Sequence, residues 1–432
     1  MLRFSAVRRA TLVKVGRGVE NITESASNSL LESLQNHGYC YIQHPFIQKS
    51  ILDQLHRDCR IFFEQYVLNV PDTTGGTKRG NNKHNYNCSP LSEYELEGIR
   101  SPTGFRGYYR YVGASGLDDA IDCFSIGRED AADPAELRRN YYIQAGWEEQ
   151  EYLPLINRRN PWDVLLNHVN TYPATEKGAP HFTGPNNNFM SDFRDMMVAY
   201  YELCSIVSID VLRHISCGLG IRPSIPQGGF DPASEYDYNF FTSFHNKKDF
   251  DLQAKYYPQL GTASRVKQGV EIGNKQSPQN PDGVRVLRRK GAKTTPLVGE
   301  DTDDETGKSK ESVVRLDTHK DLSTLTLLSQ DALGGLEVWD EEKKDYVAVP
   351  VLEDALLVNA GLFLEKWTGG LIEATPHRVR TRSHHNNNSR CSIVFFALPN
   401  HDAKIEPLLQ QDDNPAVDTQ EGFYAGDMMP TP

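Results

Sequence analysis

VVRLDTHKDLSTLTLLSQDALGGLEVWD, residues 313–340, opens the part of the chain whose pattern decides the fold. Short segments rich in β-branched and apolar residues follow one another up to residue 399, separated by Gly, Asp, Asn and Pro. Seven segments have this character: residues 313–321, 322–328, 334–340, 345–352, 354–361, 376–383 and 390–399. Closely spaced strands with no helix predicted between them indicate an antiparallel barrel or a two-sheet jelly roll.

Upstream of these strands, apolar residues recur at helical spacing. Residues 28–65 predict a helix, the short strand HGYCYIQHP and a second helix. GFRGYYRYVG, residues 104–113, predicts an aromatic strand, and residues 193–218 predict a long helix that stops at Gly218. The fold class is therefore α+β: a double-stranded β-helix, or jelly-roll, core with an N-terminal helical module and flanking helices.

Two segments differ in composition from the rest. The first nineteen residues, MLRFSAVRRATLVKVGRGV, are basic and amphipathic and carry no acid, which is typical of a mitochondrial targeting segment; a basic tail on a cytoplasmic protein is the alternative. Residues 261–312 hold many charges, Gly, Pro, Ser and Thr but no aromatic residue, which predicts a disordered insertion.

Composition narrows the class of partner. The 432 residues carry a net charge of −12, which argues against nucleic-acid binding, and no apolar run is long enough for a membrane span. The seven cysteines include no C-x-x-C, so neither a disulfide framework nor a thiolate zinc site is indicated, and we expect a reducing compartment. A small-molecule partner fits best, and the oligomeric state stays open.

His319, Asp321 and His377 predict a metal centre. The first two are two positions apart in a strand-like segment, so their side chains share one face, and His377 begins another predicted strand. Two imidazoles and one carboxylate form the facial triad of non-haem Fe(II), which leaves open positions for reactants. Zinc is less favoured because the H-E-x-x-H spacing is absent. No catalytic residue beyond the metal centre is predicted.

Arg390 and Ser392 repeat this two-residue spacing within the apolar strand RCSIVFFAL. An arginine directed into an apolar strand requires a partner, because an isolated buried charge is costly. Its planar group matches a carboxylate, to which a nearby hydroxyl adds a further hydrogen bond. The pair predicts a binding site for a dicarboxylate.

Four segments occur in the order HKDLSTLTLLSQDALGGLEVWD, VNAGLFLEKWTGG, ATPHRV and RCSIVFFALPN. In these segments the chain resembles the isopenicillin N synthase-like Fe(II)/2-oxoglutarate-dependent dioxygenases. The resemblance implies that His319, Asp321 and His377 bind Fe(II), and that Arg390 and Ser392 bind the distal carboxylate of 2-oxoglutarate. It also implies an oxidoreductase that uses O2 to hydroxylate, desaturate or cyclise a small organic molecule, with release of succinate and CO2.

The resemblance also implies a division of the chain. We expect a targeting segment at 1–20, an N-terminal helical or mixed module at 21–190, the dioxygenase jelly roll with its insertion at 191–410, and a tail at 411–432. The family's Asn-x-Tyr element has no match, its nearest candidate being TSFHN with Ser243 and His245, so the group that holds the keto-acid end is left open.

Two alternatives to this function remain. One is an iron-dependent oxidase of the same fold that does not use 2-oxoglutarate, in which Arg390 and Ser392 hold the substrate's own carboxylate. The other is a non-catalytic binding protein that keeps the barrel. Neither the substrate nor the outcome of its oxidation follows from the sequence. Trp367 is expected in the core, and the Gly pairs at 334–335 and 369–370 are expected in turns.

Overall fold

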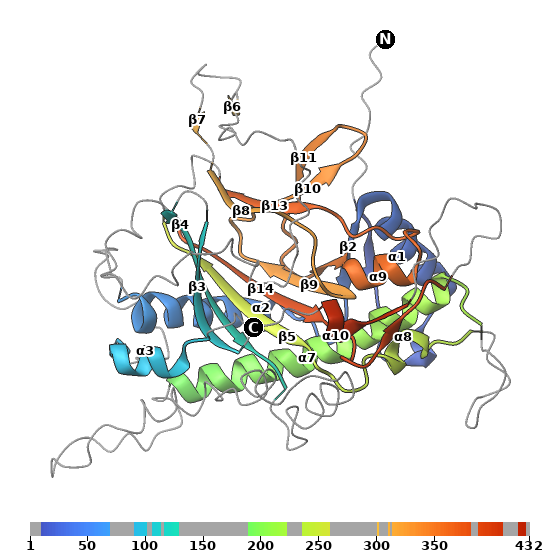
Figure 1. Cartoon of the computed structure of the whole chain (residues 1–432), viewed down its shortest axis with the longest axis horizontal. Helices are drawn as coiled ribbons and strands as arrows, with labels where there is room; N and C mark the ends of the chain where they lie inside the picture. Colours follow the sequence, from blue (N-terminus) through green and yellow to red (C-terminus); the bar gives the residue numbers. More distant parts are fainter. Residues whose placement is uncertain are drawn as a thin grey trace.

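The computed structural model describes residues 10–69, 90–101, 106–113, 116–128, 189–222, 236–259, 300–301, 310–311, 313–381, 388–408 and 422–428. Its centre is two facing sheets, with helices on the outer side of the larger one (Figure 1). Among these residues, no helix is long and apolar enough to cross a membrane.

The larger sheet has eight strands in the order β1-β2-β12-β9-β14-β5-β4-β3, and all neighbours are antiparallel except β1 and β2. Its strands are β1 (Leu12–Lys14), β2 (Tyr39–Gln43), β3 (Gly107–Gly113), β4 (Gly116–Ile126), β5 (Asp251–Tyr257), β9 (Leu325–Gln330), β12 (Leu356–Ala360) and β14 (Arg390–Ala397). The smaller, antiparallel sheet has the order β11-β10-β13-β8. Its strands are β8 (Val313–His319), β10 (Leu336–Asp340), β11 (Asp345–Ala348) and β13 (His377–Thr381).

The seven strands predicted between residues 313 and 399 all form, as β8 to β14. The absence of a helix among them was wrong, because α9 (Leu362–Trp367) follows β12. Phe363, Leu364 and Trp367 of α9 are buried, so the segment has an apolar helical face that the strand pattern around it conceals. Trp367 packs edge-on against Phe241 in the core, as expected. Both Gly pairs have positive φ, as turns require.

Helices cover the outer face of the larger sheet. The main ones are α1 (Glu24–His37), α2 (Lys49–Ile61), which continues as the π-helical η2 (Phe62–Val67), and α7 (Phe189–Gly218). The short ones are η1 (Val19–Asn21), α3 (Glu93–Ile99), α8 (Phe240–Ser243) and α10 (Ala425–Met428). Thr23 caps α1 by accepting from the Ala26 N–H, and Gly38 ends it in the left-handed conformation. The long helix predicted at residues 193–218 is α7, which begins one turn earlier than predicted, at Phe189.

The larger sheet draws its strands from both sides of the predicted boundary at residue 190. Strands β1 to β4 come from the expected N-terminal module, yet they pair into the same sheet as β5, β9, β12 and β14. Strand order follows hydrogen-bond partners distant in sequence, which a linear division of the chain does not capture.

The structure describes parts of the expected targeting segment, of the insertion and of the tail. Residues 12–14 form β1, and Val13 and Val15 are buried, so a presequence ending at residue 20 would take a strand out of the sheet. The tail contributes β16 (Phe423–Tyr424), which pairs with β15 (Lys404–Ile405). Most of 261–312 lies outside the described residues, except for the pair β6 (Glu300–Asp301) and β7 (Lys310–Glu311).

Candidate metal centre and adjoining pocket

His319, Asp321 and His377 meet between the two sheets. His319 ends β8 and His377 begins β13, and the two are register partners in that antiparallel pair. Asp321 Oδ1 lies 3.7 Å from His319 Nε2 and 3.5 Å from His377 Nε2. All three potential ligand atoms lie within 4.8 Å of one another, and the three side chains are at most 12% exposed.

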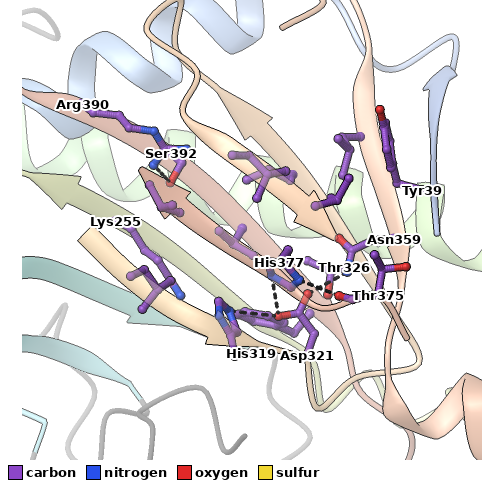
Figure 2. A pocket seen from close by; sticks show the side chains of 18 of the residues that line it. Tyr39, Lys255, His319, Asp321, Thr326, Asn359, Thr375, His377, Arg390 and Ser392 are labelled. Atoms are coloured by element: carbon purple, nitrogen blue, oxygen red, sulfur yellow. Dashed lines mark hydrogen bonds and ion pairs between the residues drawn. The ribbon is translucent and has the colours of Figure 1, made fainter. Parts of the chain in front are cut away.

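Hydrogen bonds fix how the three side chains are presented (Figure 2). His319 Nδ1 bonds the Asp317 carbonyl at 2.8 Å, and His377 Nδ1 bonds the Thr375 carbonyl at 3.0 Å. A carbonyl can only accept, so each Nδ1 carries the proton and each Nε2 offers a lone pair to the centre.

Asn359, on β12, fixes the carboxylate. Its Nδ2 donates to Asp321 Oδ2 at 2.8 Å, so Asp321 Oδ1 is left to face the two histidines. Burial alone would raise the pKa of Asp321, but the two histidines and Asn359 hold it well below its usual range. The pKa of His377 is lowered by burial, yet the charge and hydrogen bond of Asp321 raise it above its ordinary value. The cluster is thus an anionic carboxylate between two nitrogen donors, a donor set that fits a divalent non-haem metal.

Arg390 and Ser392 lie at the other end of the same pocket. Arg390 Nη1 donates to Ser392 Oγ at 3.0 Å, as their two-residue spacing on β14 predicts. Nη2 donates to Gln330 Oε1 at 3.2 Å, Nε donates to the Gly334 carbonyl, and the guanidinium lies 4.6 Å from the Tyr257 ring centroid. Arg390 is 5% exposed, so a buried cation is held among neutral acceptors.

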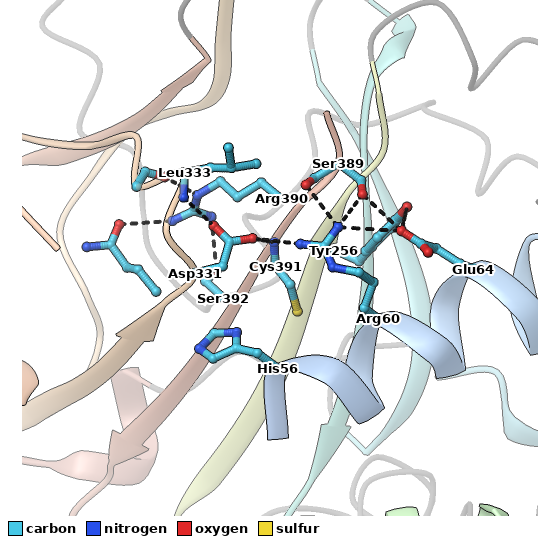
Figure 3. Close-up of polar contacts among 12 residues, drawn as sticks. His56, Arg60, Glu64, Tyr256, Asp331, Leu333, Ser389, Arg390, Cys391 and Ser392 are labelled. Atoms are coloured by element: carbon cyan, nitrogen blue, oxygen red, sulfur yellow. Dashed lines mark hydrogen bonds and ion pairs between the residues drawn. The ribbon is translucent and has the colours of Figure 1, made fainter. Parts of the chain in front are cut away.

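Helix α2 supports the start of β14 beside this arginine (Figure 3). Asp331 accepts from the Cys391 N–H at 2.6 Å and from Arg60 Nη2 at 2.9 Å through the same oxygen. Glu64 accepts from Ser389 Oγ and from the Tyr256 hydroxyl, each at 2.9 Å. These contacts on both sides of Arg390 hold the strand that presents it.

The pocket runs from the metal centre to Arg390 between the two sheets. Its walls are largely apolar, with Leu316, Leu336, Val338 and Val379 from the smaller sheet and Tyr39, Tyr257, Leu328, Leu357, Val394 and Phe396 from the larger. Its polar lining is the metal cluster, Lys255, Thr326, Asn359, Thr375, Arg390 and Ser392.

The five residues predicted for the site line this one pocket, but sequence reasoning missed others. Lys255 and Tyr257 enter it from β5, and their signal was a lysine in the mainly apolar and aromatic segment LQAKYY. The segment TSFHN does not line the pocket: His245 is buried elsewhere, where it bonds the Phe241 carbonyl at 2.7 Å and Thr324 Oγ1 at 2.8 Å. The Ser243 hydroxyl donates to the Phe240 carbonyl within α8.

Comparison with known proteins shows what the segment that carries this site resembles. Residues 281–399 match the family model of the 2OG-Fe(II) oxygenase superfamily.

Curated relatives extend this likeness. The chain is 27% identical over 241 residues to the 2-oxoglutarate-Fe(II) type oxidoreductase ppzD of Metarhizium rileyi, which covers 55% of this chain and 51% of that protein. It is 38% identical over 91 residues to the 2-oxoglutarate-dependent dioxygenase tropC of Talaromyces stipitatus, covering 21% and 27%. The chain therefore spans about half the length, or less, of these two relatives.

A solved structure shares the fold over nearly the whole chain. A full-length Neurospora crassa protein, crystallised in complex with alpha-KG, superposes with a TM-score of 0.56 at 20% identity, covering 96% of this chain and 93% of that one. The jelly-roll core, with helices packed on one face, is thus common to both proteins.

Proposed function

We propose that this protein is an Fe(II)- and 2-oxoglutarate-dependent dioxygenase that oxidises a small organic molecule by hydroxylation, desaturation or ring closure. The observation that carries the proposal is the presence, in one pocket, of the His319, Asp321 and His377 cluster and the buried Arg390. The match of residues 281–399 to the 2OG-Fe(II) oxygenase family model and the names of the curated relatives support it.

Each side chain has a part in this function. His319, Asp321 and His377 hold Fe(II), with Asn359 keeping Asp321 Oδ1 directed at the metal. Arg390 and Ser392 bind the distal carboxylate of 2-oxoglutarate. When bound, the iron and its cosubstrate supply the activation of O2, with release of succinate and CO2.

The apolar walls of the pocket also have a part in this function. Leu328, Leu357 and Val394 line the pocket between the metal cluster and Arg390, where they exclude water and orient the cosubstrate. A low-dielectric lining also strengthens the attraction between Arg390 and a carboxylate.

A spectroscopic and product assay tests this proposal. Anaerobic addition of Fe(II) and 2-oxoglutarate to the full chain should produce a weak visible charge-transfer band that His319→Ala removes and His37→Ala, at the end of α1, retains. In air, a screen of metabolites should find compounds that stimulate 2-oxoglutarate consumption with stoichiometric succinate. Oxidation of a substrate without formation of succinate would instead identify an oxidase that does not use 2-oxoglutarate. Failure to bind Fe(II) would identify a non-catalytic binding protein.

A further inference from the structure

Lys255 is a second buried cation in the pocket. It is 5% exposed and lines the pocket from the centre of β5. An ammonium group between two sheets interacts strongly with an anion bound beside it, because little water screens the charge there. The pocket therefore holds more positive charge than Arg390 alone provides.

The strand register shows where along the pocket the Lys255 side chain begins. Its Cα is the register partner of Ser392, which bonds Arg390. The Lys255 Nζ, however, lies 5.6 Å from the ring centroid of Phe396, four residues farther along β14. The side chain thus runs along the sheet, away from the level of Ser392.

Phe396 lies at the same end of the pocket as the metal cluster. Phe396 pairs with Thr326 of β9, Thr326 pairs with Asn359 of β12, and Asn359 bonds Asp321. Figure 2 shows Lys255 between the Arg390 and Ser392 end of the pocket and the side chains of His319 and Asp321. One cation thus lies at the far end of the pocket and the other is directed toward the metal centre.

This arrangement matches a ligand with one carboxylate at each end. Among the described residues that line the pocket, Lys255 and Arg390 are the basic side chains and Asp321 is the carboxylate. A divalent metal ion brings two further positive charges, so a dianion balances more of the charge in the pocket than a monoanion does. A monoanion held by Arg390 would also place no ligand carboxylate at the metal-proximal end of the pocket.

We propose that the Lys255 ammonium holds the keto-acid carboxylate of 2-oxoglutarate, while Arg390 holds the distal one. This inference rests on the proposed function and assigns the contact that the sequence left open. Lys255 is a positioning residue: as a compact point charge with three donors, it orients the metal-proximal end of the cosubstrate without replacing a metal ligand.

The test combines two protein variants with two truncated ligands. The probes are 2-oxoglutarate, 4-oxopentanoate, which has a methyl group in place of the keto-acid carboxylate, and 2-oxopentanoate, which has a methyl group in place of the distal carboxylate. Dissociation constants are measured by ligand-observed NMR on the chelator-treated full chain, so that no metal contributes to binding.

Each variant should respond to one carboxylate alone. Lys255→Met should weaken 2-oxoglutarate and 2-oxopentanoate about 10- to 100-fold and leave 4-oxopentanoate unchanged, as expected for loss of one charge-assisted hydrogen bond. Arg390→Met should weaken 2-oxoglutarate and 4-oxopentanoate and leave 2-oxopentanoate unchanged. Lys255→Arg should recover part of the lost affinity.

The controls separate this role from a structural one. Lys247→Met removes the same charge from the segment before β5, where Lys247 pairs with Asp402 on the surface, and should leave all three constants unchanged. The inference is overturned if Lys255→Met weakens the binding of all three ligands equally or weakens none of them. It is also overturned if the only effect of this substitution is a higher KM for the substrate that is oxidised. If the wild-type chain binds no 2-oxoglutarate even with metal, the proposed function itself fails.

Discussion

His319 and His377 are register partners on adjacent antiparallel strands, with ring centroids 4.2 Å apart. Sheet pairing, rather than a flexible loop, therefore sets the separation of the two imidazoles. Because each ring is also hydrogen-bonded through Nδ1 to a backbone carbonyl, the two Nε2 atoms are presented together before any metal arrives. A centre of this kind is preorganised by β8 and β13.

Asn359→Leu should weaken metal binding while leaving all three metal-binding side chains in place. The substitution removes the donor to Asp321 Oδ2, so the carboxylate can rotate away from the histidines. Loss of such an orienting contact costs about 10- to 100-fold in metal affinity. Competition with a chromophoric chelator measures the change.

Asn239→Leu provides the matched substitution for this experiment, because Asn239 is exposed and lies outside the pocket. It should leave metal affinity at the wild-type value. Equal affinities for the Asn359→Leu and wild-type proteins would show that the bond to Asp321 has no part in holding the metal.

Asp331→Ala should cost far more stability than Arg60→Met, although the two residues form one ion pair. Removing Asp331 leaves the Cys391 N–H and the Arg60 guanidinium without their shared acceptor, and we expect a loss of about 2–3 kcal/mol. Removing Arg60 breaks a partly exposed pair, since its side chain is 32% exposed, and should cost about 1 kcal/mol or less. Urea unfolding of both variants measures the difference, and similar losses would contradict this ranking.

The stability of the fold should fall between pH 6.5 and 4 because of His245. Burial lowers its pKa to about 4, against the partial opposing effect of the Phe241 carbonyl. An unfolded histidine takes up a proton near pH 6.5. The unfolded chain thus binds more protons in this range, so the contribution of neutral His245 is complete above pH 6.5 and is lost as the pH falls toward 4.

The difference between the wild type and His245→Gln isolates this effect. Glutamine keeps hydrogen-bonding capacity for Phe241 and Thr324 but does not titrate. Its unfolding free energy should fall less steeply below pH 6.5, with a relative change of about 3 kcal/mol by pH 4. Parallel pH profiles for the two proteins would refute the assignment.

Deleting residues 1–18 should destabilise the protein, whereas deleting 1–9 should have little effect. The longer deletion removes β1 with its buried Val13 and Val15 and the bond from the Gly18 N–H to Asp210. Burial of two valines contributes about 3 kcal/mol or more, so thermal unfolding should shift down by several degrees. Equal melting temperatures would show that β1 adds no stability to the sheet.

Some features followed from local pattern because local spacing determines them. Two-residue spacing on a strand predicts a shared face, and Arg390 and Ser392 do bond each other on β14. Alternating apolar segments and turn residues likewise predicted the seven strands β8 to β14. The helix α9 was missed because six residues between two strands are too few for a helical period to stand out.

By itself, the sequence determined where the strands β8 to β14 run along the chain and which residues could build a metal centre and a carboxylate site, and it predicted the class of chemistry. Only the tertiary structure decided that β1 to β4 complete the larger sheet, that Asn359 and Gln330 approach Asp321 and Arg390, and that Lys255 enters the pocket. The reason is physical: these contacts depend on which distant strands pair and in which register, and a shift of one residue would turn each side chain to the opposite face.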